Sequence, residues 1–423
     1  MPLSADPSAT HPDGKIAVDL RQVVYALSDA LDLVGIDDVG HGKRVGIMAR
    51  ACGLELAVPP AEQTFLFDLG MLHDIGVSST ATHNHLLLEF DWEGSQQHCE
   101  IGYRLLRDFA PLARLAVPVR YHHTHWEELA AMPDLPTAVA EQANLIYLVD
   151  RVDTLAAPHY GSGDLLMHTA GIRDKIAARA GRYFQPQLVE AFLAASLTEA
   201  FWLELEPRGI QAVMQEMLSQ AAPYPATIAE LKQLAAMFSQ IVDAKSTFTA
   251  EHSTGVSRLA RFFAEGLGVS PTQCDKLEIA GLLHDLGKLR VPDEVLDKPG
   301  RLDDRERKLM NAHSYETFQI LRRIKGFEEI TQWASCHHEE HDASGYPFHL
   351  NGQDLPLEAR ILRVADIFQA MAQDRPYRAG LAPDEILAFM RRLVSEGRIE
   401  VDILRVAERD MAGAMAAARA AMV

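Results

Sequence analysis

Apolar residues recur at three- and four-residue spacing along most of the chain, starting near Val18. Leu20, Val23 and Leu27 show this spacing, which places apolar side chains on one face of a helix. Alternation of apolar and polar residues, the pattern of a half-buried strand, is scarce. The sequence therefore predicts an all-α protein. The expected helices cover residues 45–56, 62–73, 99–109, 137–155, a pair within 186–218, 254–267, 272–284, 303–325, 330–338, 357–371, 383–396 and 400–423.

Polar stretches interrupt this helical pattern at several places. We expect residues 1–15 to be disordered, residues 74–97 to form a His-rich loop and residues 156–180 to be a break. The segment Ala221-Ala222-Pro223-Tyr224-Pro225 is the best domain boundary, because two prolines interrupt any helix there. Pro225 could then open the next helix, since proline is favoured at the first helical position.

The predicted organisation is two tandem helical domains joined by a helical linker. The linker helix is either a signalling connector or dimerisation helix, or it packs within the C-terminal core, and the pattern favours neither. The expected parts are an N-terminal domain at 16–222, the linker helix at 223–245 and a C-terminal domain at 246–423 that ends in a helix.

Composition narrows the function classes. The net charge of −19 argues against a nucleic-acid-coating protein, whose surface would be basic. No run of about 18 apolar residues exists that could span a membrane, and the first 15 residues lack the apolar core of a signal peptide. The four cysteines have no CxxC spacing, as expected of free thiols in a reducing compartment: Cys52, Cys99, Cys274 and Cys336. We therefore expect a cytoplasmic protein.

Metal-ligand residue types occur twice along the chain at matching spacing. The His73-Asp74 pair follows His41 by 32 residues, and His284-Asp285 follows His252 by the same interval. The flanks also agree, with Gly-Met-Leu before the first pair and Gly-Leu-Leu before the second. The N-terminal set is His41, His73, Asp74, His98, His122, His123 and Asp150. The C-terminal set is His252, His284, Asp285, His313, His337, His338 and Asp366.

A single histidine is usually a core or surface side chain without a ligand. Seven ligand-type residues that are repeated at matching spacing favour metal binding instead. Histidine and carboxylate without clustered thiolate suit Fe, Mn, Zn, Co or Ni. Seven ligands exceed the needs of one ion with an open position, so Asp285 could bridge two ions. Two ions activate a water and bind phosphoryl oxygens, which makes phosphate-ester hydrolysis the leading chemistry.

Lys288 is the candidate phosphate-binding residue. It lies about one turn past His284 if the helix continues, and its ammonium could act as a point charge on a phosphate. The alternative is a solvated surface lysine.

The C-terminal half resembles an HD-GYP domain, a subgroup of the HD phosphohydrolase superfamily that hydrolyses cyclic dinucleotides. The resemblance covers about residues 245–400, and the whole chain resembles the tandem arrangement in which a degenerate HD domain precedes HD-GYP. The motifs are His284-Asp285-Leu286-Gly287-Lys288, His337-His338-Glu339, Gly345-Tyr346-Pro347 and Arg375-Pro376-Tyr377-Arg378.

The resemblance implies that the C-terminal set ligates two divalent metals, Fe or Mn in preference to Zn, Ni, Co or Mg. Some relatives hold a third ion with a carboxylate where this chain has Phe248. Asp285 would bridge the ions and Lys288 would contact the scissile phosphate, so these two are the catalytic residues. Tyr346, Arg375 and Arg378 would contact the dinucleotide together with Lys288.

The resemblance also implies the reaction, which is hydrolysis of cyclic di-GMP to linear pGpG, GMP or both in bacterial second-messenger signalling. One alternative is the same chemistry on cyclic GMP-AMP or another nucleotide. Another is a non-catalytic receptor that docks partner proteins, such as a diguanylate cyclase, through the Gly345-Tyr346-Pro347 loop. A homodimer is also possible. An HD-type oxygenase is disfavoured, because Lys288 and this loop indicate phosphate handling.

The N-terminal half keeps the ligand set and departs elsewhere. Val77 stands where the other half has Lys288, and Thr124 stands where it has Glu339. No Gly-Tyr-Pro follows His122-His123. Three interpretations are open for this half: a metal-loaded regulatory or sensory domain, a catalyst for a different phosphate ester, or a structural remnant.

In the C-terminal half, Ala343 stands where the family often has Gly. The alanine should be tolerated unless the backbone there needs a positive φ.

Overall fold

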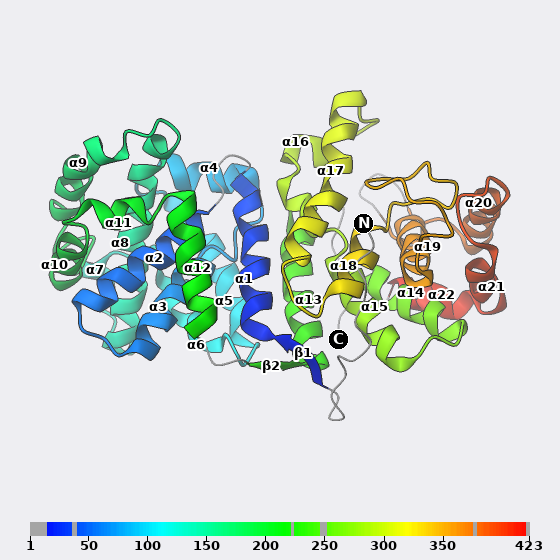
Figure 1. Cartoon of the computed structure of the whole chain (residues 1–423), viewed down its shortest axis with the longest axis horizontal. Coiled ribbons are helices and arrows are strands. Elements are labelled where there is room, and N and C mark those ends of the chain that lie inside the picture. The colour runs from blue at the N-terminus through cyan, green and yellow to red at the C-terminus, as the bar shows by residue number, and fades with distance from the viewer. Residues whose placement is uncertain (1–14, 36–39, 221–223, 246–251, 375–378, 420–423) are drawn as a thin grey trace. The chain divides into compact units, whose positions relative to one another are not determined.

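The computed structural model describes residues 15–35, 40–220, 224–245, 252–374 and 379–419 (Figure 1). Helices dominate these ranges, which confirms the predicted all-α class. The exception in the described ranges is a two-stranded antiparallel sheet of β1 (Lys15–Asp19) and β2 (Pro225–Thr227), visible in Figure 1. None of the described helices is both long and apolar enough to cross a membrane.

The chain divides into two compact units. The N-terminal unit is Leu31–Ala222, and the C-terminal unit combines Met1–Ala30 with Pro223–Val423. This division differs from the expected boundary at residue 16, because β1 pairs with β2 and so joins residues 15–19 to the C-terminal unit. The expected linker helix also belongs to that unit, since α13 (Ile228–Ala244) buries its apolar face there and packs on α15. The structure thus agrees with the packing alternative for this helix.

The N-terminal unit is built around α2, which packs on α3, α8 and α10, while α5 packs on α6. Its elements are η1 (Asp32–Gly35), α2 (His41–Glu55), α3 (Pro60–Leu72), α4 (Thr80–Leu88), η2 (Glu93–Ser95), α5 (Gln96–Arg107), α6 (Ala113–Tyr121), α7 (Trp126–Leu129), α8 (Thr137–Tyr160), α9 (Leu165–Ala177), α10 (Pro186–Ala195), α11 (Glu199–Leu203) and α12 (Pro207–Gln220).

The C-terminal unit is built around α14, which packs on α15, α19 and α22. Besides β1, β2, α13 and α1 (Leu20–Leu31), whose last residue falls in the N-terminal unit, its elements are α14 (His252–Gly266), α15 (Pro271–Leu283), η3 (Leu286–Arg290), α16 (Asp293–Leu296), α17 (Asp304–Leu321), α18 (Glu328–Ser335), α19 (Leu357–Ala372), α20 (Pro383–Ser395), α21 (Val401–Arg409) and α22 (Met411–Arg419).

Local capping signals fix where key helices begin. The Asp303 side chain accepts a hydrogen bond from Glu306 N at 2.8 Å, and the Glu306 side chain accepts one from Asp303 N. The helix α17 therefore starts with a capping box. Thr227 and Glu230 form the same box at the start of α13. The expectation that Pro225 opens this helix is therefore wrong, because the capping box sets the start at Ile228 and Pro225 belongs to β2.

The structure also differs from the prediction at an expected loop, an expected break and an expected single helix. The predicted loop at 74–97 contains α4, whose first turn is capped by Ser79, which accepts from Thr82 N at 3.1 Å. The predicted break at 156–180 shrinks to four residues between α8 and α9, because α8 continues through Pro158 and α9 follows at once. The predicted helix at 400–423 is split between α21 and α22 at Asp410, whose backbone is not helical. Residues 1–14, expected to be disordered, lie outside the described residues.

Candidate metal centres

The C-terminal ligand set converges from three helices and from the segments that follow two others. His252 begins α14, His284 and Asp285 follow α15, His313 lies in α17, His337 and His338 follow α18, and Asp366 lies in α19. Two triads form, and within each triad the ligand atoms lie within 4.8 Å of one another. One triad is His252, His284 and Asp366, and the other is His313, His337 and His338.

Asp285 lies between the two triads and turns one oxygen toward each. Its Oδ2 lies 3.3 Å from His284 Nε2 and 3.6 Å from His252 Nε2. Its Oδ1 lies 3.5 Å from His313 Nε2 and 3.8 Å from His337 Nε2. A carboxylate placed in this way can bridge two metal ions, each held by its own triad.

A close helix crossing brings the first histidine to the His-Asp pair in both units. A Cβ on Gly281 of α15 would lie 2.8 Å from the Cα of Ser257 in α14. In the N-terminal unit, a Cβ on Gly70 of α3 would lie 2.6 Å from the Cα of Gly46 in α2. Only a residue without a side chain allows the helices to approach this far.

Hydrogen bonds behind the rings orient most of the imidazoles. The Nδ1 atoms of His284, His313 and His337 donate to backbone carbonyls at 2.7, 2.6 and 2.6 Å. A carbonyl can only accept, so Nδ1 carries the proton and Nε2 keeps its lone pair toward the cluster. His252 Nδ1 donates to Gln369 Oε1 at 2.5 Å in the same way.

His338 is held differently, because Arg363 Nη1 lies 3.1 Å from its Nδ1. A guanidinium can only donate, so in this contact the Nδ1 lone pair faces Arg363.

Burial and charge set the protonation state of this cluster. Burial would raise the pKa of Asp285, but the charges of His284 and Lys288 hold it well below its usual range. The pKa of Asp366 is also held well below its usual range, by the hydrogen bond from His252 against the effect of burial. Burial lowers the pKa of His313 to about 4 and holds those of His337 and His338 well below 6.5. Burial would also lower the pKa of His284, but the charge of Asp285 raises it. Ionised carboxylates and neutral imidazoles are the forms that ligate metals.

The residues fit a pair of divalent metal ions. His284 Nε2 and Asp285 Oδ1 are buried and have no hydrogen-bond partner among the described residues. Such atoms are costly in a protein interior unless an ion or water satisfies them. The donor set contains imidazole nitrogen and carboxylate oxygen, which suits Fe, Mn, Zn, Co or Ni.

Lys288 contacts the bridging carboxylate. The helix α15 ends at Leu283, and the 3₁₀ helix η3 carries Lys288 back so that Nζ lies 2.5 Å from Asp285 Oδ2. The lysine side chain is 18% exposed, which argues against the surface-lysine alternative.

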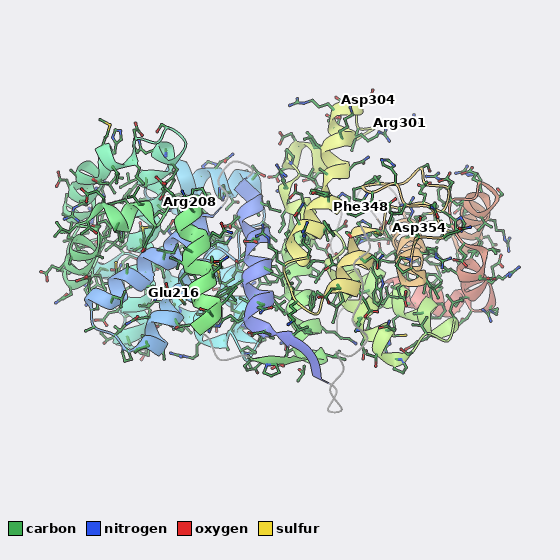
Figure 2. All side chains as sticks on the ribbon, in the orientation of Figure 1. Arg208, Glu216, Arg301, Asp304, Phe348 and Asp354 are labelled. Carbon is green, nitrogen blue, oxygen red and sulfur yellow. The ribbon has the colours of Figure 1, made fainter. Side chains whose placement is uncertain are left out.

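The Gly345-Tyr346-Pro347 loop packs directly on the histidine pair. A Cβ on Gly345 would lie 2.3 Å from the backbone N of Glu340, so the loop passes too close for any larger residue. Tyr346 N donates to His338 O at 3.2 Å, and the two rings have centroids 4.8 Å apart. The Glu339 carboxylate accepts from the backbone N of Phe348 at 2.6 Å and thereby fixes the loop. Phe348 is labelled in Figure 2.

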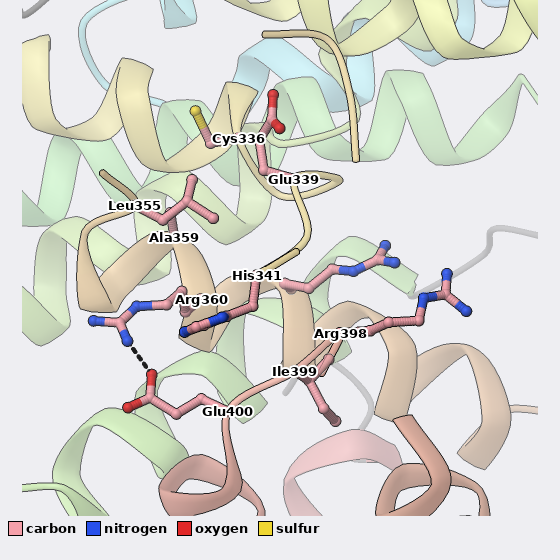
Figure 3. Close-up of a pocket in the computed structure, with 10 residues that line it drawn as sticks. Cys336, Glu339, His341, Leu355, Ala359, Arg360, Arg398, Ile399 and Glu400 are labelled. Atoms are coloured by element: carbon pink, nitrogen blue, oxygen red, sulfur yellow. Dashed lines mark hydrogen bonds and ion pairs between the residues drawn. The ribbon is translucent and has the colours of Figure 1, made fainter. Parts of the chain in front are cut away.

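Ala343 and His341 precede this loop in the sequence. Ala343 has a φ of 63°, so its backbone does adopt the left-handed conformation in which glycine would be tolerated better. His341 lines a separate pocket, where Arg360 pairs with Glu400 (Figure 3). Arg375, Arg378 and Phe248 lie outside the described residues.

The N-terminal ligand set converges in the same pattern. Asp74 Oδ2 lies 3.5 Å from His73 Nε2 and 3.7 Å from His41 Nε2. Its Oδ1 lies 3.2 Å from His98 Nε2 and 3.5 Å from His122 Nε2. The ligand atoms of each group lie within 4.8 Å of one another. The groups are His41, His73 and Asp74, and Asp74, His98, His122 and His123, with Asp150 3.4 Å from His41 Nε2.

The surroundings of this N-terminal cluster differ from those of the other. Asp153 replaces Gln369 behind the first histidine and accepts from His41 Nδ1 at 2.8 Å. Asp153 is itself bound by Arg44 Nε at 2.7 Å and by the Tyr160 hydroxyl at 2.7 Å. Val77 replaces Lys288 and is buried.

Two histidines of the N-terminal cluster have raised pKa values. Burial would lower the pKa of His41, but Asp153 and Asp150 outweigh it and raise the pKa to about 9. The pKa of His98 also rises to about 9, because Cys99 and Asp74 outweigh burial. These imidazoles would have to lose their protons to ligate a metal.

Sequence reasoning missed the residues that support the ligands. Gln369 and Asp153 each follow the last aspartate of their set by three residues, so extension of the repeat could have found them. Cys99 and Ser314 each follow the third histidine, and each lies near the ligating nitrogen of that histidine, at 3.7 and 3.3 Å. Arg363 carries no local signal, because only the fold brings it to His338.

Comparison with known proteins adds independent findings. The family described as "HD domain" matches residues 236–403. The 3′3′-cGAMP-specific phosphodiesterase 1 of Vibrio cholerae is 35% identical over 406 residues, covering 93% of this chain and 92% of that protein. The cyclic di-GMP phosphodiesterase response regulator RpfG of Xanthomonas campestris is 39% identical over 137 residues, 32% of this chain and 36% of that protein. The crystal structure of V-cGAP3, a cyclic GMP-AMP specific phosphodiesterase of V. cholerae, superposes with a TM-score of 0.62 at 24% identity, covering 95% of this chain and 97% of that one, which shows a shared fold.

Proposed function

Because the chain belongs to the HD-GYP family, we propose that its C-terminal unit is a metal-dependent phosphodiesterase of cyclic dinucleotides. The main support for this proposal is the position of Asp285. One of its oxygens faces each histidine triad, and Lys288 Nζ lies 2.5 Å from its Oδ2. This arrangement combines a two-metal cradle with a cation beside it, which matches the needs of phosphate-ester hydrolysis.

Each residue of the cluster has a distinct task in this proposal. Two divalent ions, Fe or Mn by preference, would supply an activated water and bind phosphoryl oxygens. Asp285 would hold both ions, and neutral His313 and His337 would present their Nε2 lone pairs to them. Lys288 would contact the scissile phosphate as well as Asp285, so that its ammonium offsets the negative charge that develops in the transition state. Tyr346, held on His338, borders the position of the dinucleotide.

Two substrates are proposed within this class. Cyclic di-GMP follows from the motifs, and RpfG and other relatives carry that activity in their names. Cyclic GMP-AMP is the second candidate, because the relative that matches 93% of this chain is named as specific for 3′3′-cGAMP. Such substrates would place the protein in the bacterial cytoplasm.

The test is turnover by the full chain loaded with Mn²⁺ or Fe²⁺. Cyclic di-GMP, 3′3′-cGAMP and a linear dinucleotide are supplied separately, and products are resolved by chromatography. We expect hydrolysis of at least one cyclic dinucleotide by the wild type and none by Asp285→Asn. Equal negligible rates in both proteins, each with its metal content measured, would reject the enzymatic proposal.

The rival class is a cyclic-dinucleotide receptor that acts through protein contacts. It predicts binding of the same ligands by calorimetry without turnover at full metal loading. Docking of a diguanylate cyclase on the Gly345-Tyr346-Pro347 loop and formation of a homodimer remain predictions from the sequence.

A further inference from the structure

We propose that the N-terminal unit holds a second dinuclear metal centre, bridged by Asp74 and backed by the Asp153 carboxylate. This centre is separate from the one proposed for catalysis, and the inference does not depend on which substrate the C-terminal unit hydrolyses.

Convergence of the ligands is the first support. Asp74 divides its oxygens between two histidine groups, with Oδ2 toward His41 and His73 and Oδ1 toward His98 and His122. This repeats the division seen at Asp285 with distances that agree to within about half an ångström. A structural remnant free of selection for metal binding would have no reason to keep six ligand-type side chains gathered in two groups. The seventh, Asp150, turns Oδ1 toward His41 at 3.4 Å while Arg151 binds its Oδ2 at 2.8 Å.

Ring orientation is the second support. His73 Nδ1 donates to Gly70 O at 2.7 Å and His122 Nδ1 donates to Val119 O at 2.6 Å, so each ring presents Nε2 to the cluster. His73 is fully buried, and its Nε2 has no hydrogen-bond partner in the described part of the chain. A buried nitrogen of this kind, aimed at neighbouring ligands, is explained by an ion that binds it.

The carboxylate behind His41 is the third support. A hydrogen bond from a ligating histidine to a carboxylate makes its imidazole a stronger donor and fixes its orientation. Arg44 Nε and Nη2 hold Asp153 at 2.7 and 2.9 Å, and the Tyr160 hydroxyl holds it at 2.7 Å. The C-terminal unit has only the neutral amide of Gln369 at this place. Asp153 is therefore a positioning residue that strengthens the N-terminal centre in particular.

The centre is also reachable. The Asp74 side chain is 18% exposed, whereas the Asp285 side chain is 2% exposed. An ion here keeps a side open to solvent, as sites that exchange a water or other ligand do.

A surface cluster in the same unit is the rival site for extra ions. His159 Nδ1 lies 3.1 Å from Asp164 Oδ1, and His168 Nε2 lies 3.2 Å from Asp164 Oδ2. These side chains are between 24% and 45% exposed, and they come from the end of α8, the connection after it and the start of α9. The experiment therefore needs a variant that removes this cluster alone.

The test counts Mn²⁺ per chain in full-length protein that is stripped, reloaded with Mn²⁺, gel-filtered and measured by mass spectrometry. We expect about four ions in the wild type, about two in Asp285→Asn, about two in Asp74→Asn and none in the double variant. The Asp285→Asn protein is decisive, because it keeps the N-terminal unit intact. One ion or none in that protein overturns the proposal, even if Asp74→Asn fails to fold.

Two controls assign the retained ions. Asp164→Asn in the Asp285→Asn background should keep about two ions, and their loss would move them to the surface cluster and overturn the proposal. Retention of two ions by the double variant Asp74→Asn with Asp285→Asn would also overturn it. An exchange-coupled electron paramagnetic resonance signal from Asp285→Asn protein would show that its ions form a pair, and isolated Mn²⁺ spectra would contradict a bridged centre.

The role of Asp153 has its own readout. In the Asp285→Asn background, Asp153→Gln installs the residue type of the other unit and should lower the Mn²⁺ affinity by about 10- to 100-fold, with the ion count at saturation unchanged. Asp153→Glu should recover part of the affinity. If neither variant changes the affinity while thermal unfolding stays normal, Asp153 does not position the ligand.

Discussion

Lys288 lies beside Asp285 in the C-terminal unit, and Val77 stands at the equivalent position after Asp74 in the N-terminal unit. Lys288 Nζ contacts Asp285 and leaves that carboxylate 2% exposed, whereas Asp74 in the N-terminal unit is 18% exposed. Glu339 fixes the Gly345-Tyr346-Pro347 loop through the backbone N of Phe348, and Thr124 stands at the equivalent place, where no such loop exists. The two units share the arrangement of ligand-type residues, and they differ in the side chains and the loop beside it.

This difference separates metal binding from catalysis. The ligand-type residues and the close helix crossing at Gly70 or Gly281 are common to both units, so they are the features on which the two proposed metal sites rest. The cation and the loop occur in one unit only, so they are the parts that would handle a dinucleotide. The N-terminal unit instead has the charged pair of Asp153 and Arg44 behind its first histidine, which agrees with our proposal that this unit binds ions without acting on the dinucleotide.

The largest expected effect compares the two bridging aspartates. Asp285→Asn should lower turnover of the cyclic dinucleotide by about 10³-fold or more, because it removes the group that holds both metal positions. Asp74→Asn should leave turnover within about threefold of the wild type, since it leaves every ligand-type residue of the C-terminal unit unchanged. Initial rates at saturating Mn²⁺ check this. A comparable loss in both variants would contradict the assignment of catalysis to one unit.

The next effect tests the lysine. Lys288→Val gives the C-terminal unit the residue of the N-terminal one, and we expect kcat to fall by about 10²- to 10³-fold. The metal content should stay the same, because Lys288 is not a ligand. Lys308→Val, at an exposed position of α17, is the matched control and should leave kcat unchanged. If Lys288→Val loses its metal together with its activity, the lysine supports the cradle and not the phosphate.

A smaller effect concerns the loop. Gly345→Ala places a Cβ 2.3 Å from the backbone N of Glu340, so the loop must shift, at a cost of about 1–3 kcal/mol. Activity should fall with it, because Tyr346 moves with the loop. Gly171→Ala in α9 of the N-terminal unit meets nothing within 4 Å and should cost no stability. Calorimetric unfolding compares the two, and equal stability of both variants would refute the close approach at Gly345.

The smallest effect is a pH dependence expected of the C-terminal unit. Burial would raise the pKa of Asp275, but hydrogen bonds from Lys232 and Arg261 lower it below 3.8. Its contribution to stability is therefore present above pH 3.8 and is lost as pH falls through the lower folded-state pKa. Thr64 stands at the equivalent place in the N-terminal unit and cannot titrate.

Asp275→Asn measures this contribution. At pH 7 it should destabilise the protein by about 1 kcal/mol or less, because the pairs are near the surface. The difference from the wild type should shrink toward pH 3, as followed by urea unfolding at several pH values. A difference that is constant from pH 7 to pH 3 would show that packing, and not charge, causes the loss.

Much of the fold and of both ligand sets could be predicted from the sequence. Helical periodicity gave most helices, because an amphipathic helix is a local pattern. Capping was harder to predict, and so α4 was missed and the start of α13 was misplaced at Pro225. The partners behind the ligands were missed for another reason. Arg363 and Tyr160 reach their sites only through packing, which no spacing records.

The sequence by itself determined the helical class, the duplication and the identity of fourteen ligand-type residues, because these are properties of residue type and spacing. Only the tertiary structure decided that Asp285 and Asp74 each divide their oxygens between two histidine groups, since those distances depend on how helices cross at Gly281 and Gly70. It also decided that Lys288 contacts Asp285 although α15 ends before it, because the 3₁₀ turn of η3 brings the lysine back.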